Sequence, residues 1–230
     1  MVNLALRSKP AKVDTALNSG IIFLISGLIG ARAGYVLLHM EYFSVNLTEI
    51  PLFWQGGLSW IGCAAGLIFA AAITPKLFQI PLSLAYDQMI ALSIPLSVAA
   101  WLGGWLTGVG YGPLLLQLTW WGLTSLDETG SLAVRLPLQI ICAVLTLAGG
   151  TILDWALSHS KTLKNRFAGL AGLFLAADLL LFSILRDDPI RQLFAMRIDT
   201  LAAIILVIIS ILALLFLPTP NSGKSRQAVS

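Results

Sequence analysis

Charged side chains are scarce in this sequence, and their scarcity excludes an ordinary water-soluble domain. Only 11% of the 230 residues are charged, whereas 57% are hydrophobic, and the mean hydropathy is +0.87. A typical soluble domain carries about 25% charged residues. Several apolar runs approach the roughly 20 helical residues that cross a ~30 Å hydrocarbon core. We therefore expect one bundle of membrane-spanning helices rather than one or two soluble domains.

Cysteine and histidine are also rare. The two cysteines, Cys63 and Cys142, lie inside apolar runs, and the two histidines, His39 and His159, are far apart in the chain. A structural disulfide or a metal site needs neighbours that this sequence does not supply. We interpret the thiols as small apolar packing groups, and we expect neither a metal nor a cofactor.

Six apolar runs predict six transmembrane helices. They cover about residues 17–40, 57–73, 84–106, 136–157, 167–185 and 201–217. The first run is too long for a signal peptide, and no small-residue cleavage site closes it. The third contains Pro95, which would kink it. The predicted fold is an all-α polytopic membrane protein: an N-terminal segment at 1–16, a helical bundle at 17–217 and a tail at 218–230.

The distribution of lysine and arginine predicts the orientation. One side of the membrane would carry nine of these residues: Arg7, Lys9, Lys12, Lys76, Lys161, Lys164, Arg166, Lys224 and Arg226. The other side would carry four. We expect the nine-residue side, with both termini, to be cytoplasmic, and the long loop at 107–135 to lie outside. Within this loop, the stretch at 114–121 is too short to span and would lie along the interface, as an anchor or a lipid-facing arm.

Arg32 and Asp178 are predicted to lie deep inside spans. An arginine at such depth costs roughly 2.5–3.5 kcal/mol on insertion scales. It therefore needs a cavity, a partner or a lipid head group, and guanidinium matches phosphate with two parallel hydrogen bonds. A structural ion pair or snorkelling to the interface is the alternative. Because the two depths differ by only ~6 Å at a rise of 1.5 Å per residue, we hypothesise that Arg32 and Asp178 pair or share a polar cavity.

Several motifs occur in a characteristic order. Gly30–Val36 reads GARAGYV, Trp54–Ser59 reads WQGGLS, and Gly103–Gly112 reads GGWLTGVGYG. Pro137 with Gln139, and then Leu185–Pro189 (LRDDP), follow later. From about residue 10 to the end, this order resembles the bacterial prolipoprotein diacylglyceryl transferase family.

The resemblance implies an enzyme of the bacterial inner membrane. Such enzymes move diacylglycerol from phosphatidylglycerol to the lipobox cysteine of a prolipoprotein at the outer face. It implies these candidate lipid-binding residues: Arg32, Tyr35, Gln55, Gly56, Gly57, Gly108, Gly112, Gln139, Asp178 and Arg186. The family normally has seven spans and an outside N-terminus, so we expect its first helix to be missing here.

The chain departs from the family at the polar positions of its motifs. After Gly-Gly-Leu-Ser the family has an aromatic residue and a histidine, where this chain has Trp60 and Ile61. The family pattern Gly-Arg-x-Gly-Asn-Phe-x-Asn-Gly-Glu aligns with Ala100–Val109, which places Trp101 at the arginine and Val109 at the glutamate. Glycines and helix-packing residues remain, while ionisable side chains are replaced.

Two further motifs show the same loss. The pattern His-Pro-Ser-Gln-x-Tyr-Glu has become Leu136–Cys142, in which Gln139 is retained. In the fifth span, Leu179 and Ser183 stand where an arginine and a glutamate are expected. Thiol activation needs a base or a lowered thiol pKa, and the departing phosphate needs cationic or equivalent donors. The aligned positions offer neither, and the catalytic residues stay unidentified.

Three functions are compatible with these observations. The first is a non-catalytic relative that retains a phospholipid-holding scaffold and serves as an accessory or structural subunit. The second is a divergent active transferase that relies on Arg32 and Arg186. The third is a small transporter, against which the order of the motifs argues. The expected partners are a phospholipid such as phosphatidylglycerol and a prolipoprotein or a membrane protein complex, but no nucleic acid.

Overall fold

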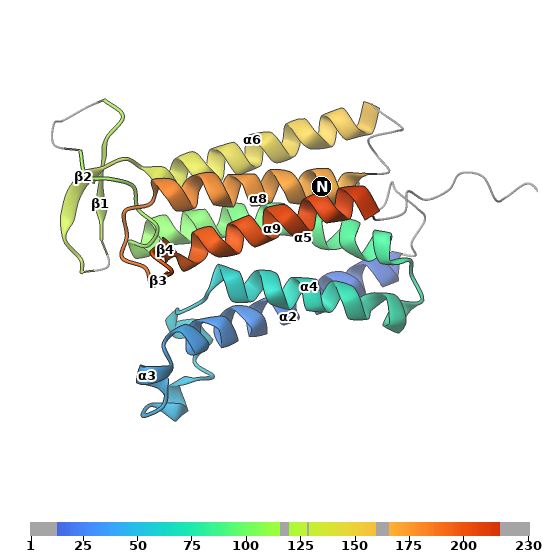
Figure 1. Ribbon diagram of the computed structural model, residues 1–230, viewed down its shortest axis with the longest axis horizontal. Helices are drawn as coiled ribbons and strands as arrows, with labels where there is room; N and C mark the ends of the chain where they lie inside the picture. Colours follow the sequence, from blue (N-terminus) through green and yellow to red (C-terminus); the bar gives the residue numbers. More distant parts are fainter. Residues whose placement is uncertain (1–12, 116–119, 128, 160–165, 217–230) are drawn as a thin grey trace, which may run out of the picture. The chain divides into compact units, whose positions relative to one another are not determined.

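The computed structural model describes residues 13–115, 120–127, 129–159 and 166–216. Within these ranges, six helices are long and apolar enough to cross a membrane (Figure 1). They are α2 (Val13–Leu38), α4 (Trp60–Phe78), α5 (Leu82–Thr107), α6 (Leu138–His159), α8 (Phe167–Leu185) and α9 (Ile198–Phe216). The predicted all-α polytopic fold with six spans is therefore confirmed. Pro95 lies inside α5 without ending it.

Short elements connect the spans. Between α2 and α4 lie α3 (Met40–Phe43), η1 (Leu47–Glu49) and η2 (Phe53–Gln55). Two antiparallel hairpins follow later, β1 (Leu123–Leu126) with β2 (Leu132–Arg135), and β3 (Gln192–Leu193) with β4 (Met196–Arg197). In the register, Leu123 pairs with Arg135 and Leu193 with Met196. Figure 1 places both hairpins at the same end of α6, α8 and α9.

Parts of the predicted segments fall outside the described residues. Residues 1–12 of the N-terminal segment and the whole tail at 218–230 lie outside them, whereas residues 13–16 begin α2. In the predicted interfacial stretch at 114–121, residues 116–119 also lie outside them. Leu114 bridges to Arg135, and the Leu115 N–H donates to the Val134 carbonyl. This end of the stretch therefore joins the β1–β2 hairpin.

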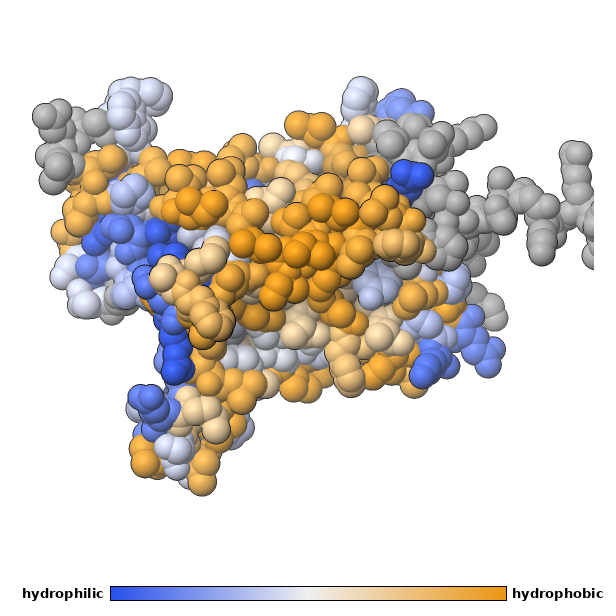
Figure 2. Space-filling view, in the orientation of Figure 1, coloured by the Kyte–Doolittle hydropathy of each residue, from blue (hydrophilic) through white to orange (hydrophobic). Residues whose placement is uncertain are grey.

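The chain divides into two compact units, residues 1–89 and 90–230. In the first unit, α2 packs against α4. In the second, α8 packs against both α9 and α6. Apolar side chains cover the visible face of α9 (Figure 2), where Ile205, Ile208 and Leu212 are among the exposed residues. Exposed apolar helix faces of this kind are what a hydrocarbon environment requires.

Glycines bring the backbones of α2 and α4 into direct contact. A Cβ built on Gly30 would lie 2.4 Å from the Gly62 carbonyl oxygen, and one built on Gly62 would lie 2.2 Å from the Gly30 oxygen. A Cβ on Gly66 would lie 2.2 Å from the Ser26 oxygen. Small residues are the usual device for close helix packing in membranes, where no hydrophobic force drives helices together. These three glycines, of which Gly30 belongs to the GARAGYV motif, therefore serve helix packing.

Candidate functional site

Arg32 organises the connection between α2 and α4 in the first unit. Its guanidinium donates four hydrogen bonds to backbone carbonyls: Nε to Ile50 (2.8 Å), one terminal nitrogen to Gly56 (2.8 Å) and Gly57 (3.1 Å), and the other to Glu49 (2.7 Å). These acceptors lie 17 to 25 residues along the chain from Arg32. The side chain thus holds the connection folded around itself.

Two rings and a glycine complete this arrangement. The Arg32 guanidinium carbon lies 5.2 Å from the centre of the Phe43 ring and 5.9 Å from that of Tyr35, within cation–π range. Gly57 has a φ of 69°, and a Cβ there would lie 2.6 Å from the Tyr35 ring and 2.8 Å from an Arg32 nitrogen. Only glycine combines that backbone conformation with that space. Three of the candidate lipid-binding residues, Tyr35, Gly56 and Gly57, therefore lie around Arg32, while the Gln55 side chain is exposed. Their binding of lipid stays a prediction.

The hydrogen bonds of Arg32 among the described residues go to carbonyl oxygens and not to a carboxylate. Carbonyl oxygens carry no net charge, and the nearby Glu49 carboxylate instead accepts a 2.7 Å hydrogen bond from the Tyr42 hydroxyl. That hydrogen bond raises the pKa of Tyr42. A guanidinium has five N–H donors, and four hydrogen bonds to carbonyls are already made. Of the five N–H groups, one is then left over by the contacts among the described residues, and an anion at Arg32 could bind it. A phosphate that accepts two hydrogen bonds from Arg32 would have to displace a carbonyl.

Exchange of Arg32 for lysine should open this connection. Lysine offers three donors on a flexible stem rather than a planar fork, so the carbonyls of residues 49–57 would lose partners. We expect faster amide hydrogen exchange across residues 46–57 in Arg32→Lys and a loss of about 2 kcal/mol of stability, the scale of hydrogen bonds to charged groups. Arg166→Lys, an exposed arginine before α8, is the matched control. Unchanged exchange in Arg32→Lys would show that the connection holds itself.

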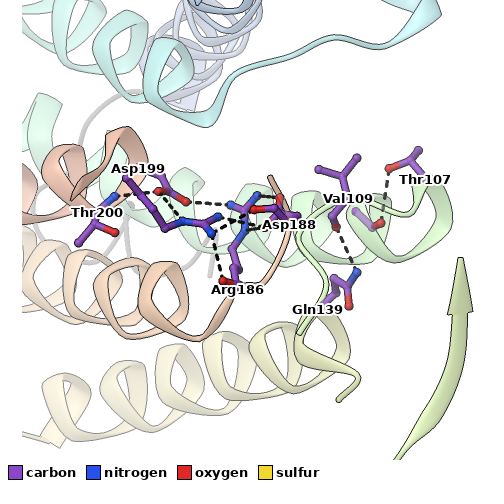
Figure 3. Close-up of polar contacts among 9 residues, drawn as sticks. Thr107, Val109, Gln139, Arg186, Asp188, Asp199 and Thr200 are labelled. Atoms are coloured by element: carbon purple, nitrogen blue, oxygen red, sulfur yellow. Dashed lines mark hydrogen bonds and ion pairs between the residues drawn. The ribbon is translucent and has the colours of Figure 1, made fainter. Parts of the chain in front are cut away.

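Four ionised side chains form a closed network in the second unit (Figure 3). Arg186 donates two hydrogen bonds to the Asp188 carboxylate, through Nε at 2.9 Å and through one terminal nitrogen. Its other terminal nitrogen lies 3.4 Å from a carboxylate oxygen of Asp199. Arg197 contacts the same two carboxylates, at 3.1 Å for Asp188 and 3.3 Å for Asp199. Two cations and two anions thus balance one another.

Burial makes this network tight. The side chains of Arg186, Asp188 and Asp199 are 9%, 4% and 1% exposed. Burial acts against the charge on Asp188, but Arg186 and Arg197 outweigh it and place the pKa of Asp188 below its ordinary value. Burial likewise acts to lower the pKa of Arg186, but the two aspartates raise it above its ordinary value. Arg186, a predicted lipid ligand, therefore has its guanidinium engaged by two carboxylates.

An apolar cluster occupies the positions at which the resemblance expects polar motif residues. Leu138, Cys142 and Phe182 are buried to 2% exposure or less, and partly buried hydrophobic residues pack against them. These neighbours are Trp101, Leu136 and Ile141. The Trp101 and Phe182 rings meet edge to face with their centres 5.8 Å apart. Trp101 stands at the expected arginine position of one family motif. Four residues stand at the expected histidine, serine, tyrosine and glutamate positions of another: Leu136, Leu138, Ile141 and Cys142. All five side chains lie in this apolar cluster.

Gln139 ties α6 to the loop after α5. Its amide nitrogen donates to the Val109 carbonyl at 3.1 Å (Figure 3), and its side chain is 1% exposed. Its amide oxygen is buried and finds no donor among the described residues. In the same loop, a Cβ on Gly108 would lie 2.8 Å from the Asp127 oxygen, and one on Gly112 would lie 2.8 Å from the Leu136 oxygen. The predicted residues Gly108, Gly112 and Gln139 therefore lie near one another, packed against the protein's own backbone.

Asp178 has a partner within its own unit. Its carboxylate accepts a 2.6 Å hydrogen bond from the Thr146 hydroxyl, which joins α8 to α6. The hypothesised pairing with Arg32 would link two different units and stays a prediction. Sequence reasoning missed Thr146 and the roles of Asp188, Arg197 and Asp199. The repeated pattern Arg-x-Asp, at 186–188 and again at 197–199, was a signal for the ion network.

Comparisons with known proteins show which family the chain resembles. A family model described as prolipoprotein diacylglyceryl transferase matches residues 1–216. The chain is 28% identical to the phosphatidylglycerol–prolipoprotein diacylglyceryl transferase of Leptothrix cholodnii, over 67% of this chain and 56% of the relative. For the proteins of the same name from Paramagnetospirillum magneticum and Rickettsia canadensis, the identities are 26% and 31%, over 75% and 73% of this chain. The chain spans 64% of the length of each of these two.

Proposed function

The chain belongs to the prolipoprotein diacylglyceryl transferase family, and from this premise we propose that it is a non-catalytic relative. It would retain a phospholipid-holding scaffold in the bacterial inner membrane and act there as an accessory or structural subunit. Its relatives are named for phosphatidylglycerol and prolipoprotein, which makes the first the preferred lipid and the second a candidate partner.

The apolar cluster around Cys142 carries this proposal. Diacylglyceryl transfer to a cysteine needs a base or a lowered pKa for the attacking thiol. It also needs donors at the departing glycerol phosphate. Trp101, Leu136, Leu138, Ile141 and Cys142 stand at the aligned polar positions and pack against one another instead. A side chain that is closed into a hydrocarbon core can supply neither function.

Arg186 and Arg197 have a structural role in this proposal, whereas Arg32 attracts the lipid. Arg186 and Arg197 are neutralised by Asp188 and Asp199, so they add little field at a phosphate. Arg32 is held by neutral carbonyls instead. An anionic head group such as that of phosphatidylglycerol is therefore best placed at Arg32, bound by charge and by one N–H. Tyr35, Gly56 and Gly57 form its surroundings.

A divergent active transferase is the second candidate. The name shared by the relatives favours it. So does the buried Gln139 amide oxygen, which has no donor among the described residues and could accept a hydroxyl or thiol proton. In this reading Arg32 would be the principal cation at the phosphate. Family membership supports either candidate over a small transporter.

The two candidates differ in a direct assay. The purified protein, in phosphatidylglycerol vesicles with a lipobox peptide, should release no glycerol phosphate above a protein-free control. The Leptothrix cholodnii transferase, assayed in parallel, serves as the positive control. We also expect no rescue of growth in a strain depleted of its transferase. Release of glycerol phosphate together with a lipidated peptide would establish the active candidate and overturn the non-catalytic one.

A further inference from the structure

The turn that joins β3 to β4 has an unusual backbone for its residues. Leu193 pairs with Met196, so two residues close the hairpin. These residues, Phe194 and Ala195, have φ angles of 52° and 59°. A two-residue hairpin with φ > 0 at both central positions normally uses Asn-Gly, Asp-Gly or Gly-Gly. A phenylalanine and an alanine adopt it only at a cost in free energy, so the fold tolerates strain to present these side chains.

The turn presents an apolar tip. Phe194 is 88% exposed, Leu193 is 51% exposed and Met196 is 40% exposed. The turn between β1 and β2 shows the contrasting composition. There, one Asp127 carboxylate oxygen accepts hydrogen bonds from the N–H groups of Thr129 and Ser131. That polar turn suits water, whereas the β3–β4 turn does not.

The buried ion network holds the base of this hairpin. One terminal nitrogen of Arg197 donates to the carbonyls of Arg186 and Asp188, both at 3.1 Å. The Ile198 N–H donates to the Arg191 carbonyl at 3.1 Å. The two ends of the connection are thereby fastened to each other. A strained turn on such a base stays formed and keeps Phe194 outward.

The hairpin is short and lies between two spanning helices. It follows the last residue of α8, Leu185, and precedes the first residue of α9, Ile198. Phe194 stands four residues before Ile198, which limits the chain between them to about 13 Å at roughly 3.3 Å per residue. At the last turn of α8, Ile184 (66% exposed) and Leu185 (42% exposed) are also exposed apolar side chains. A tip this close to a spanning helix would lie near the level where hydrocarbon gives way to head groups.

We propose that the β3–β4 turn is a lipid anchor, with Phe194 inserted at the boundary between the phospholipid head groups and acyl chains. Exposed Trp, Phe and Leu side chains of interfacial segments insert at this boundary. The occupant is membrane lipid, because the exposed apolar tip is tethered between two spanning helices, α8 and α9. The anchor would fix the α8–α9 end of the second unit against the bilayer. It does not depend on whether the chain transfers diacylglycerol.

Photo-crosslinking from the full-length protein tests this proposal. Phe194→benzoylphenylalanine keeps an aromatic side chain and needs no change of Cys63 or Cys142. After irradiation in nanodiscs of phosphatidylglycerol and phosphatidylethanolamine, intact-mass spectrometry should show an adduct with the mass of one phospholipid. Phe69→benzoylphenylalanine, at a 65% exposed position on the spanning helix α4, gives the reference yield for a site expected to face lipid. Thr129→benzoylphenylalanine, in the polar turn between β1 and β2, should give a phospholipid adduct only at background level.

Each other outcome would overturn the lipid anchor. A crosslink from position 194 to a second protein, seen as a band of higher mass on a denaturing gel, would assign the tip to a protein partner or to another copy of the chain. A yield at position 194 equal to that at position 129, while position 69 reacts, would place the tip in water. Co-elution of each variant with the unmodified protein on size exclusion verifies that the fold is intact.

Discussion

Gly62→Ala is expected to break the packing of α2 against α4. The new methyl group would lie 2.2 Å from the Gly30 carbonyl oxygen and 2.9 Å from the Gly34 Cα, and both of these are backbone atoms that cannot move aside alone. The helices would have to separate, which would also loosen the glycine contacts along the rest of the interface. We expect a loss of about 3 kcal/mol, the upper end of ordinary overpacking costs, measured as a lower midpoint of thermal unfolding in detergent.

Gly20→Ala, on the partner helix α2, is the matched control. A Cβ at Gly20 meets no other atom within 4 Å, and alanine favours a helix over glycine by up to ~1 kcal/mol. This variant should therefore melt at or above the wild-type temperature. Equal melting of Gly62→Ala and the wild type would show that the two helices are not held at backbone contact.

Asp199→Asn should have the second large effect, in the other unit. Asp199 is 1% exposed and contacts both Arg186 and Arg197. Asparagine preserves its shape but removes the charge. The guanidinium groups of Arg186 and Arg197, 9% and 20% exposed, then share the single carboxylate of Asp188. Removing one partner of a buried ion pair typically costs 3–5 kcal/mol, roughly, because the remaining charge is uncompensated. The measurement is the midpoint of thermal unfolding at neutral pH.

Asp187→Asn is the control that distinguishes loss of the ion network from loss of any one negative charge. Asp187 is the exposed neighbour of Asp188, so its loss should change stability by no more than ~0.5 kcal/mol. Joint replacement of the four charged residues by apolar residues of similar volume should cost much less than Asp199→Asn, since buried ion pairs exchanged as a unit are often neutral. If Asp199→Asn and Asp187→Asn unfold at the same temperature, the network contributes no stability.

The candidate site was only partly predictable. The resemblance pointed to Arg32, Tyr35, Gly56 and Gly57, and the structure gathers them, because the motif spacing preserves the local shape of the α2–α4 connection. The partners of Arg186 were not predicted. One of them, Asp188, lies two residues along the chain, and the other, Asp199, lies beyond the β3–β4 hairpin at the start of α9. Whether a guanidinium binds a phosphate or a carboxylate depends on which group the fold brings within hydrogen-bond distance.

By itself, the sequence determined the six spans and the all-α class, and it predicts the loss of polar residues from the family motifs. Membrane insertion depends on the summed hydropathy of a continuous run, and that sum can be read from the chain alone. Only the tertiary structure decided that the altered motif positions close into an apolar cluster around Cys142. It also decided that Arg32 is satisfied by carbonyls while Arg186 is neutralised by aspartates. A guanidinium binds whichever acceptor the fold places beside it, and residues distant in the chain supply that acceptor.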